Sequence, residues 1–272
     1  MSLKNKIILI TGSSRGIGRE FALRFAQEGA HLIITGKSET EGRLPGTIYS
    51  VAEEVKAAGG TALPIPIDLR DDATVEKMVA QVAETYGKID ILINNAGAIS
   101  LTPLQATPMK KVDLMLHLNL RAVLICSQLC IPHLKAAGGG HILNLSPPLS
   151  ADPKWYKNNV VYTISKFGMT MATLGLAEEL APDKIAVNSL WPRTLIASAA
   201  TKMLFGESGM PHCRTASIMA DAAYEIITTD PTKLSGQALL DEPFLRSRAY
   251  TDFEKYRIDP NVKPELDLFV EE

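Results

Sequence analysis

The sequence predicts an α/β protein with a doubly wound, seven-stranded parallel sheet in a single domain. Short apolar runs alternate with longer amphipathic stretches, as repeated β-α-β units require. The chain has 272 residues, 46% hydrophobic and 21% charged, which is enough to bury one large core. We find no internal repeat, low-complexity tract or long linker. We therefore expect residues 1–272 to form one domain.

Seven strands are expected where short apolar runs are bounded by turn residues. They lie at residues 7–10, 31–35, 62–67, 89–93, 141–145, 185–190 and 237–240. A glycine-rich turn follows the first strand and opens a helix with apolar positions at Ile17, Phe21 and Phe25. Gly29 is placed to end that helix as its C-terminal cap.

Two segments lack clear periodicity, and we expect both to lie outside the repeating units. Residues 194–215 follow the sixth strand and are expected to form a substrate lid. Residues 241–272 are expected to form a wrapping C-terminal extension.

Composition argues against several classes of partner. The formal net charge is −2 with acids and bases interspersed, so neither nucleic acid nor a membrane surface is an expected partner. The chain has three cysteines, no secretory leader and no continuous apolar run near eighteen residues, which predicts a reducing, cytoplasmic location. Cys126 and Cys130 stand four apart, but no neighbouring His/Cys pair completes a metal site, so we expect core packing and no metal.

The glycine-rich turn from Thr11 to Gly18 is a candidate phosphate site. Its glycines permit a tight turn and a close approach of the backbone, and amides at the positive end of a helix can meet a pyrophosphate. The spacing is Gly-x-x-x-Gly-x-Gly, which differs from the Gly-x-Gly-x-x-Gly fingerprint. Because glycines also serve plain turns, this segment alone is moderate support for a dinucleotide.

Tyr162 and Lys166 are the candidate catalytic pair. Interconversion of an alcohol and a carbonyl needs a group that moves the hydroxyl proton, and an unperturbed tyrosine, with a pKa of about 10, is too weak a base at neutral pH. A lysine one helical turn away lies on the same face, and its charge would favour the phenolate and lower that pKa. An isolated pair of this kind is usually a buried tyrosine beside a surface lysine. No other tyrosine has lysine four positions later.

Three motifs together carry a resemblance to a known family. The turn from Thr11 to Gly18, the run Asn94-Asn95-Ala96-Gly97 and the Tyr162-x-x-x-Lys166 pair resemble the short-chain dehydrogenase/reductase family in identity, order and separation. The resemblance covers roughly residues 5 to 240. It implies a Rossmann-type dinucleotide-binding domain and a nicotinamide-dependent oxidoreductase acting on a small-molecule alcohol or carbonyl.

The resemblance also implies roles for individual residues. The implied catalytic residues are Tyr162, Lys166, Ser146 and Asn119. The implied cofactor-binding residues are Gly12, Ser14, Arg15, Gly16, Ile17, Gly18, Lys37, Asp68, Leu69, Asn95, Ala96, Gly97, Tyr162, Lys166 and Pro192. Lys166 would also bond the nicotinamide ribose, and Asn119 would hold a water for the proton relay.

The chain departs from the family pattern at two points. The family's serine usually stands thirteen residues before the tyrosine, where this chain has Leu149; of the two neighbouring candidates, Ser146 is preferred over Ser150 because it directly follows a strand. Where the family commonly has glycine after Pro192, this chain has Arg193. That side chain would reach the cofactor amide region, an anionic substrate or solvent.

The end of the second strand predicts NADP rather than NAD. An acidic residue there would bond the ribose hydroxyls and repel a 2′-phosphate, and none is present. Lys37 follows the strand and Arg15 lies in the glycine-rich turn, so two cations could converge on the phosphate. The alternative is that both are surface charges, blunted by Glu39 and Glu41.

Two other functions remain open. An enoyl reductase of the same fold would resemble Tyr-x6-Lys, and the residues seven positions after Tyr162 and Tyr156 are Met169 and Thr163. A binding module that senses the cofactor without turnover would not need Tyr162 and Lys166.

The substrate and the assembly are less defined. An apolar pocket could be lined by Trp155, Tyr156, Trp191, Met203, Leu204 and Phe205, although such residues are more often core. The helix from 162 to 180 is more apolar than one core-facing stripe requires, which predicts a homodimer or homotetramer. Several segments resemble a subgroup whose animal members add a sterol-carrier domain, for which we expect no room here.

Overall fold

The computed structural model describes residues 2–42 and 44–271 and contains a seven-stranded sheet. All strand pairs are parallel, in the order β3-β2-β1-β4-β5-β6-β7. The strands are β1 (Ile7–Ile10), β2 (His31–Gly36), β3 (Thr61–Pro66), β4 (Ile91–Asn94), β5 (Gly140–Asn144), β6 (Ile185–Trp191) and β7 (Ala238–Leu240). The prediction of a doubly wound parallel sheet is confirmed, with every strand within two residues of its expected bounds.

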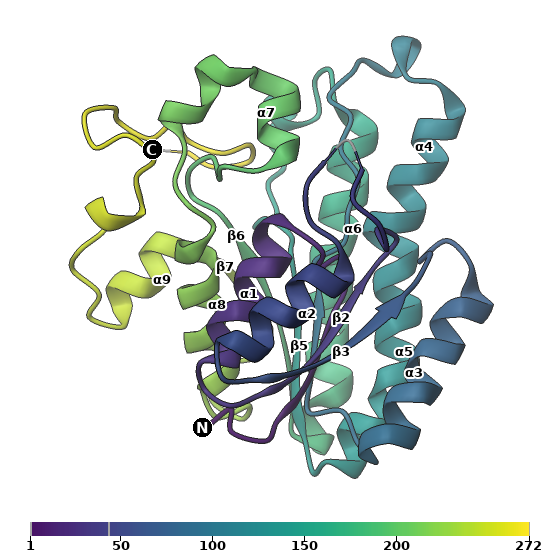
Figure 1. The fold of residues 1–272 in the computed structure, drawn as a ribbon. Coiled ribbons are helices and arrows are strands. Elements are labelled where there is room, and N and C mark those ends of the chain that lie inside the picture. Colours follow the sequence, from purple (N-terminus) through teal and green to yellow (C-terminus); the bar gives the residue numbers. More distant parts are fainter. Residues whose placement is uncertain (1, 43, 272) are drawn as a thin grey trace.

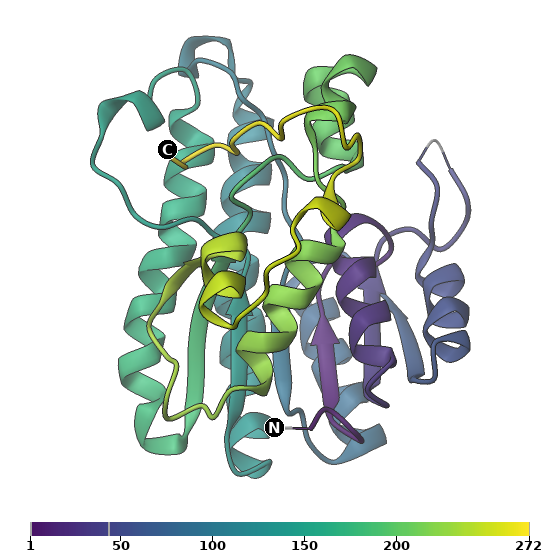
Figure 2. The same ribbon diagram turned by 90° about the vertical axis from the view of Figure 1, so that its left-hand side faces the viewer.

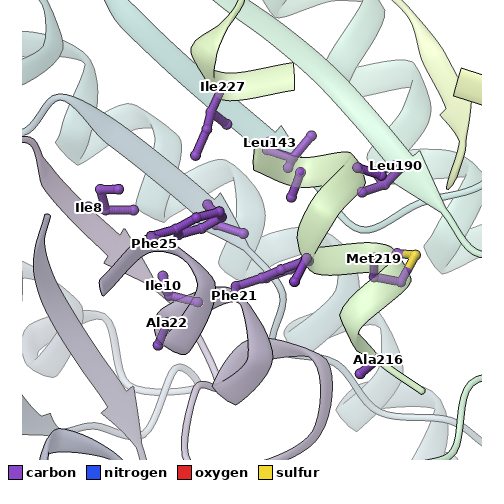
Figure 3. Close-up of a cluster of buried hydrophobic side chains, with 14 of the residues drawn as sticks. Ile8, Ile10, Phe21, Ala22, Phe25, Leu143, Leu190, Ala216, Met219 and Ile227 are labelled. Carbon is purple, nitrogen blue, oxygen red and sulfur yellow. The ribbon is translucent and has the colours of Figure 1, made fainter. Parts of the chain in front are cut away.

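Helices cover both faces of the sheet (Figure 1). One face carries α1 (Gly16–Ala26), α2 (Ile48–Ala57) and α8 (Ser217–Thr228), with α1 packed between the other two. Figure 3 shows Ile8 and Ile10 of β1 lying beside Phe21 and Phe25 of α1, with Met219 of α8 on the far side. Because helices bury both faces, the central strands are apolar throughout instead of alternating.

The opposite face carries α3 (Asp72–Tyr86), α5 (Ala122–Ala136) and α6 (Val160–Leu180). Helix α4 (Met109–Leu116) runs into α5 through one π-helical turn, η2 (His117–Arg121). Cys126 and Cys130 are fully buried in this layer, and burial raises the pKa of Cys126 to about 12, so its thiol stays neutral.

Two helical stretches, Met109–Ala136 and Val160–Asp183, are long and apolar enough to cross a membrane by length and composition alone. The sequence analysis expected no such run because a few polar residues interrupt each stretch. In this fold both stretches pack on the sheet, and 39% and 56% of their most apolar windows are buried. Their composition therefore reflects a core-facing side together with an apolar outer side.

The remaining segments gather at one end of the molecule. Figure 2 shows the yellow C-terminal tail crossing the upper end of the molecule, past the green α7 (Ala199–Phe205), toward the teal helices. The tail follows α9 (Asp241–Ser247). The 3₁₀ helices are η1 (Leu104–Ala106), η3 (Pro153–Trp155), η4 (Ala181–Asp183), η5 (Glu207–His212) and η6 (Glu254–Tyr256).

Helix α1 ends differently from the prediction. Its C-cap is Gln27, and Gly29 lies two residues further on with φ +74°. The Gly29 amide donates to the Ala26 carbonyl, so the glycine completes the turn that leads into β2 without being the cap itself.

The strand order reverses between β1 and β4, which are neighbours in the sheet. At such a switch point, the loops after the two strands leave in opposite directions and open a crevice at the carboxyl ends of the strands. The glycine-rich turn follows β1 and the Asn95–Gly97 run follows β4, so the fold places both motifs at this crevice.

Candidate active site

The glycine-rich turn presents free backbone amides at the start of α1. Arg15 is the N-cap, in an extended conformation, and no side chain caps the helix. A Cβ on Gly18 would lie 2.5 Å from Asn95 Nδ2 and 2.6 Å from the Gly12 carbonyl oxygen, so only glycine fits there. Uncapped amides at a positive helix end, approached over glycine, fit a dinucleotide pyrophosphate.

Hydrogen bonds hold the run after β4 against this turn. Thr11 Oγ1 accepts from the amides of Asn95 (3.0 Å) and Ala96 (3.1 Å). Asn95 Nδ2 donates to the carbonyls of Thr11 and Gly12, both at 2.9 Å. Two segments more than eighty residues apart therefore form one rigid wall of the crevice.

Tyr162 and Lys166 lie one turn apart on α6, and both face a cavity of about 490 Å³. Each is only 5% exposed. Lys166 Nζ donates to the Leu145 carbonyl at 2.8 Å and lies 5.4 Å from the centre of the Trp191 ring. The sequence pair thus becomes a phenol and an ammonium group in one apolar chamber.

The electrostatics of this pair differ from the sequence-based expectation that Lys166 lowers the tyrosine pKa. Burial raises the pKa of Tyr162, and the charge of Asp267 raises it further. Burial also lowers the pKa of Lys166 to about 8, against the opposing effect of Asp267. Desolvation is the largest cause of both shifts, and Lys166 Nζ donates its hydrogen bond to the Leu145 carbonyl.

Asn119 lies in the π-helical turn η2 and is fully buried. Its Nδ2 donates to the Ala98 carbonyl and to Ser165 Oγ, both at 2.9 Å, and its Oδ1 accepts from the Ala98 amide at 2.8 Å. The side chain therefore ties the loop after β4 to α6. A π-helical turn is a frequent feature of functional sites; in Asn119 these bonds use both Nδ2 hydrogens, whereas Oδ1 accepts one bond and has a second lone pair.

The structure does not bring Ser146 to the cavity. Ser146 is fully buried, and its Oγ accepts a hydrogen bond from Thr170 Oγ1 at 2.8 Å. Ser150 Oγ accepts from the Asp152 amide, and Leu149 is 41% exposed. None of the three is among the residues that line the cavity.

The expected cation pair lies beside the turn after β2. Arg15 Nη2 donates to Ser38 Oγ and to the Gly46 carbonyl, both at 2.8 Å. Ser38 directly follows Lys37 in the chain, so the first of these bonds holds the guanidinium at the turn that carries Lys37. Lys37 Nζ pairs with Asp68 at 2.9 Å.

Arg70 was missed by the sequence analysis. It pairs with Asp68 at 2.6 Å. The cations Lys37 and Arg70 lower the pKa of the Asp68 carboxyl. The sequence feature that could have identified Arg70 is its position two residues after Asp68, within the loop that follows β3. The site therefore holds three cations: Lys37 and Arg70 pair with the Asp68 carboxylate, and Arg15 is bonded to Ser38, the residue after Lys37.

Arg193 has a structural partner. Its Nη1 lies 3.3 Å from Glu242, which also pairs with Arg214 and Arg246. The Arg193 amide donates to Asp241 Oδ1 at 2.8 Å. The Arg193 guanidinium thus anchors α9 while remaining partly exposed to solvent, one of the three environments expected for it.

Residues from distant segments line the cavity. Trp155, Trp191, Leu204 and Phe205 do so as predicted, whereas Tyr156 and Met203 do not. Asn95, Gly97 and Pro192 also line it, which joins the cavity to the expected cofactor crevice. The segment between β6 and α8 contributes Leu195, Ile196, Ser198, Ala200 and Thr201.

The C-terminal tail forms one wall of the cavity, a contribution absent from the sequence analysis. The Asp267 amide donates to the Arg193 carbonyl at 3.0 Å, and Leu266 forms an antiparallel bridge with Thr194. Trp191 Nε1 donates to the Leu268 carbonyl at 2.8 Å. The Phe269 ring stacks on Tyr162 with centroids 6.1 Å apart.

Fold and site together define a Rossmann-type oxidoreductase. The chain belongs to the short-chain dehydrogenase family: the family model described as "short chain dehydrogenase" matches residues 6–205. This match confirms the resemblance inferred from the three motifs.

Relatives and solved structures agree with that assignment. The chain is 49% identical to hydroxysteroid dehydrogenase-like protein 2 of Danio rerio and 44% identical to that of Homo sapiens, covering 97% of this chain in each case. The chain spans 63% of the length of both relatives. The predicted likeness to this subgroup, carried by Ala98-Ile99-Ser100 and Leu145-Ser146-Pro147-Pro148 among other segments, is confirmed.

Among solved structures, a putative dehydrogenase from Xanthomonas campestris has a TM-score of 0.96 at 45% identity, with 100% of both chains covered. A metagenomic short-chain oxidoreductase in complex with NADP has a TM-score of 0.74 at 25% identity, covering 88% of this chain and 98% of its own.

Proposed function

We propose that this chain is an NADP-dependent oxidoreductase that interconverts an alcohol and a carbonyl. The observation that carries the proposal is the placement of Tyr162 and Lys166, one turn apart on α6, in an apolar cavity continuous with the dinucleotide crevice. In such a chamber a phenol can exchange a proton with a substrate oxygen without competition from bulk water.

In the reducing direction, Tyr162 donates its proton to the substrate oxygen. The nicotinamide, when bound, supplies the hydride. Lys166 holds positive charge near the phenolate left on Tyr162 and stabilises it. Trp191 and Phe269 pack around the pair and exclude water from it. In the oxidising direction the same groups run in reverse, with Tyr162 accepting the proton.

The proposed cofactor preference rests on charge. Lys37 and Arg70 share the Asp68 carboxylate, and Arg15 is bonded to Ser38 beside Lys37, so the negative charge of a 2′-phosphate would complement the excess positive charge of these three cations. Glu39 is bonded to the Tyr49 hydroxyl and Glu41 to the Gly46 amide, and among the described residues neither forms an ion pair with Arg15, Lys37 or Arg70. One related solved structure contains NADP.

Turnover separates this proposal from the two alternatives. The assay follows NADPH absorbance with small aliphatic ketones, 4-nitrobenzaldehyde, a 3-ketosteroid and the enoyl thioester crotonyl-CoA. Reduction of carbonyls supports the proposal, whereas reduction of crotonyl-CoA alone supports an enoyl reductase. NADPH binding without any turnover supports a sensing module.

We also propose a lid and a cytoplasmic location. Residues 194–215, which include α7, cover the cavity and are the segment best placed to move on substrate binding. The cysteines Cys126, Cys130 and Cys213 are free and buried, as a reducing compartment favours. Location of a tagged full chain in cytosolic fractions tests the second proposal.

A homodimer or homotetramer is expected in solution. The outer side of α6 exposes Ile164, Met171 and Leu174 by 50%, 61% and 40%, and Leu124 of α5 is 45% exposed. Contiguous apolar side chains of this kind are costly to leave in water, and a second copy of α6 would cover them symmetrically.

The measurement is hydrodynamic mass by light scattering at micromolar concentration. A mass of 29.5 kDa, that of one chain, would contradict the proposal. In the variant Met171→Glu the assembly is expected to dissociate, while the exposed control Lys77→Glu on α3 leaves it intact.

A further inference from the structure

We propose that Asp267, on the C-terminal tail, is a catalytic residue that donates a hydrogen bond from its neutral carboxyl group to the substrate oxygen protonated by Tyr162. The inference deepens the proposed function and rests on it. It is carried by three observations: the described residues offer no other buried and unengaged polar side chain in this part of the cavity, the tail is anchored, and charged groups surround Asp267.

A substrate oxygen that gains negative charge is stabilised by preorganised donors, and Tyr162 supplies only one. Among the described residues that line the cavity, the other polar side chains are engaged elsewhere. Asn95 Nδ2 is bonded to the glycine-rich turn. Ser198 Oγ bonds Thr201 Oγ1, which donates to the Ile196 carbonyl.

Two carboxyl groups remain, Glu265 and Asp267. Glu265 is exposed to solvent, whereas Asp267 is partly buried and lines the cavity. Ser146, the serine expected to contact the substrate, is turned onto Thr170. Asp267 is therefore the side chain available to take the second position.

The backbone of the tail is fixed on both sides of Asp267. Leu266 bridges to Thr194, and the Leu268 carbonyl accepts from Trp191 Nε1. Phe269 stacks on Tyr162 itself. An acid held between these anchors stays close to the catalytic pair without needing a substrate to order it, which is the condition for a preorganised donor.

The surroundings keep Asp267 protonated up to about pH 7. Burial raises its pKa to about 7, and the carboxylate of Asp241 on α9 adds to the increase, while the Leu268 amide and Lys166 on α6 oppose it. The remaining titratable groups nearby are Tyr162, Cys213 and Glu265. Arg193 and Arg214 do not neutralise Asp267, because both pair with Glu242.

A neutral Asp267 also makes it easier for Tyr162 to give up its proton. The ionised carboxylate raises the pKa of Tyr162, so protonation of Asp267 removes that obstacle to forming the phenolate. One proton passes from Tyr162 to the substrate oxygen. Asp267 keeps its own proton and donates a hydrogen bond with it to the same oxygen.

Kinetics with 4-nitrobenzaldehyde and NADPH test the proposal. Asp267→Leu removes the donor and is expected to lower kcat/KM at least tenfold, with the dissociation constant for NADPH unchanged by fluorescence. Asp267→Asn retains a donor and is expected to restore most of the activity. The tail control Glu271→Gln, which loses only an exposed ion pair with Lys154, is expected to match the wild type.

The pH profile gives a second readout. In the wild type, kcat/KM for reduction is expected to fall as the pH rises through about 7, when Asp267 loses its proton. In Asp267→Asn that fall disappears and only the loss near pH 8 from Lys166 remains. Identical profiles would overturn the proposal, as would an Asp267→Leu variant within threefold of the wild type or an Asp267→Asn variant as impaired as Asp267→Leu.

Stability provides a test without any substrate. Because the folded pKa of Asp267 is raised, ionisation costs stability from about pH 4 upward and the cost is complete above about pH 7. Asp267→Asn is therefore expected to gain stability relative to the wild type as the pH rises through this range, measured by urea denaturation. If Asp267→Asn instead lost stability relative to the wild type as the pH rises, the ionised Asp267 would be forming a favourable ion pair, and the proposal would be overturned.

The two proposals fail separately. Carbonyl reduction that survives Tyr162→Phe contradicts the proposed function. Reduction that is lost in Tyr162→Phe but retained in Asp267→Leu contradicts the role of Asp267 alone.

Discussion

Replacing Tyr162 by phenylalanine is expected to lower kcat ~100- to 10,000-fold, the range typical of a lost general acid or base. The hydroxyl has no hydrogen-bond partner among the described residues, while the ring keeps its stacking on Phe269. Removing one oxygen therefore leaves the core contacts in place. The fold, and the affinity for NADPH measured by fluorescence titration, are expected to be retained.

The matched control for this substitution is Tyr156→Phe. The Tyr156 hydroxyl donates to the Ser150 carbonyl at 2.8 Å, and the residue does not line the cavity. This variant is expected to keep near-normal kcat. Near-normal kcat in Tyr162→Phe as well, or a large loss of NADPH affinity, would contradict the assigned role.

Replacing both Arg15 and Lys37 by alanine is expected to raise KM for NADPH ~100-fold and to change KM for NADH by much less. Each cation is expected to make a charge-assisted hydrogen bond to the 2′-phosphate, and such bonds contribute ~1.5–3 kcal/mol each before solvent screening. NADH lacks that phosphate, so the double substitution removes only the weaker long-range attraction between these two cations and the rest of the dinucleotide.

Single and control substitutions sharpen this test. Lys37→Ala leaves Asp68 paired with Arg70 alone, so its effect is expected to be smaller than that of the double change. The exposed Lys77→Ala on α3 is expected to change neither constant. Equal effects on both cofactors, or a wild-type enzyme that prefers NADH, would contradict the NADP assignment while leaving Tyr162 and Lys166 unaffected.

Much of the fold and part of the site were predictable from local sequence. The strands are continuous apolar runs because helices cover both faces of the sheet, and that pattern is visible without any contact information. The glycine-rich turn, the Asn95–Gly97 run and the Tyr162–Lys166 spacing are local features. The strand order then brings them together at the carboxyl edge of the sheet.

Other features depend on where chain segments meet. Ser146 follows its strand as expected, yet packing against Thr170 on α6 decides that its hydroxyl faces away from the cavity. For Arg193 the sequence left the cofactor, an anionic substrate and solvent open, and did not identify its pairing with the buried Glu242 on α9. In both cases the partner is remote in sequence, so no spacing rule could identify it.

The sequence alone determined the α/β class, the parallel sheet, the phosphate turn and the Tyr162–Lys166 pair, because each is encoded by residues within one or two turns of chain. Tertiary structure decided the protonation energetics and the final wall of the site. Burial, not the nearby lysine, sets the pKa of Tyr162, and Asp267 reaches the cavity only because its tail pairs with the backbone after β6. Desolvation depends on everything that surrounds a group, which a local pattern does not contain.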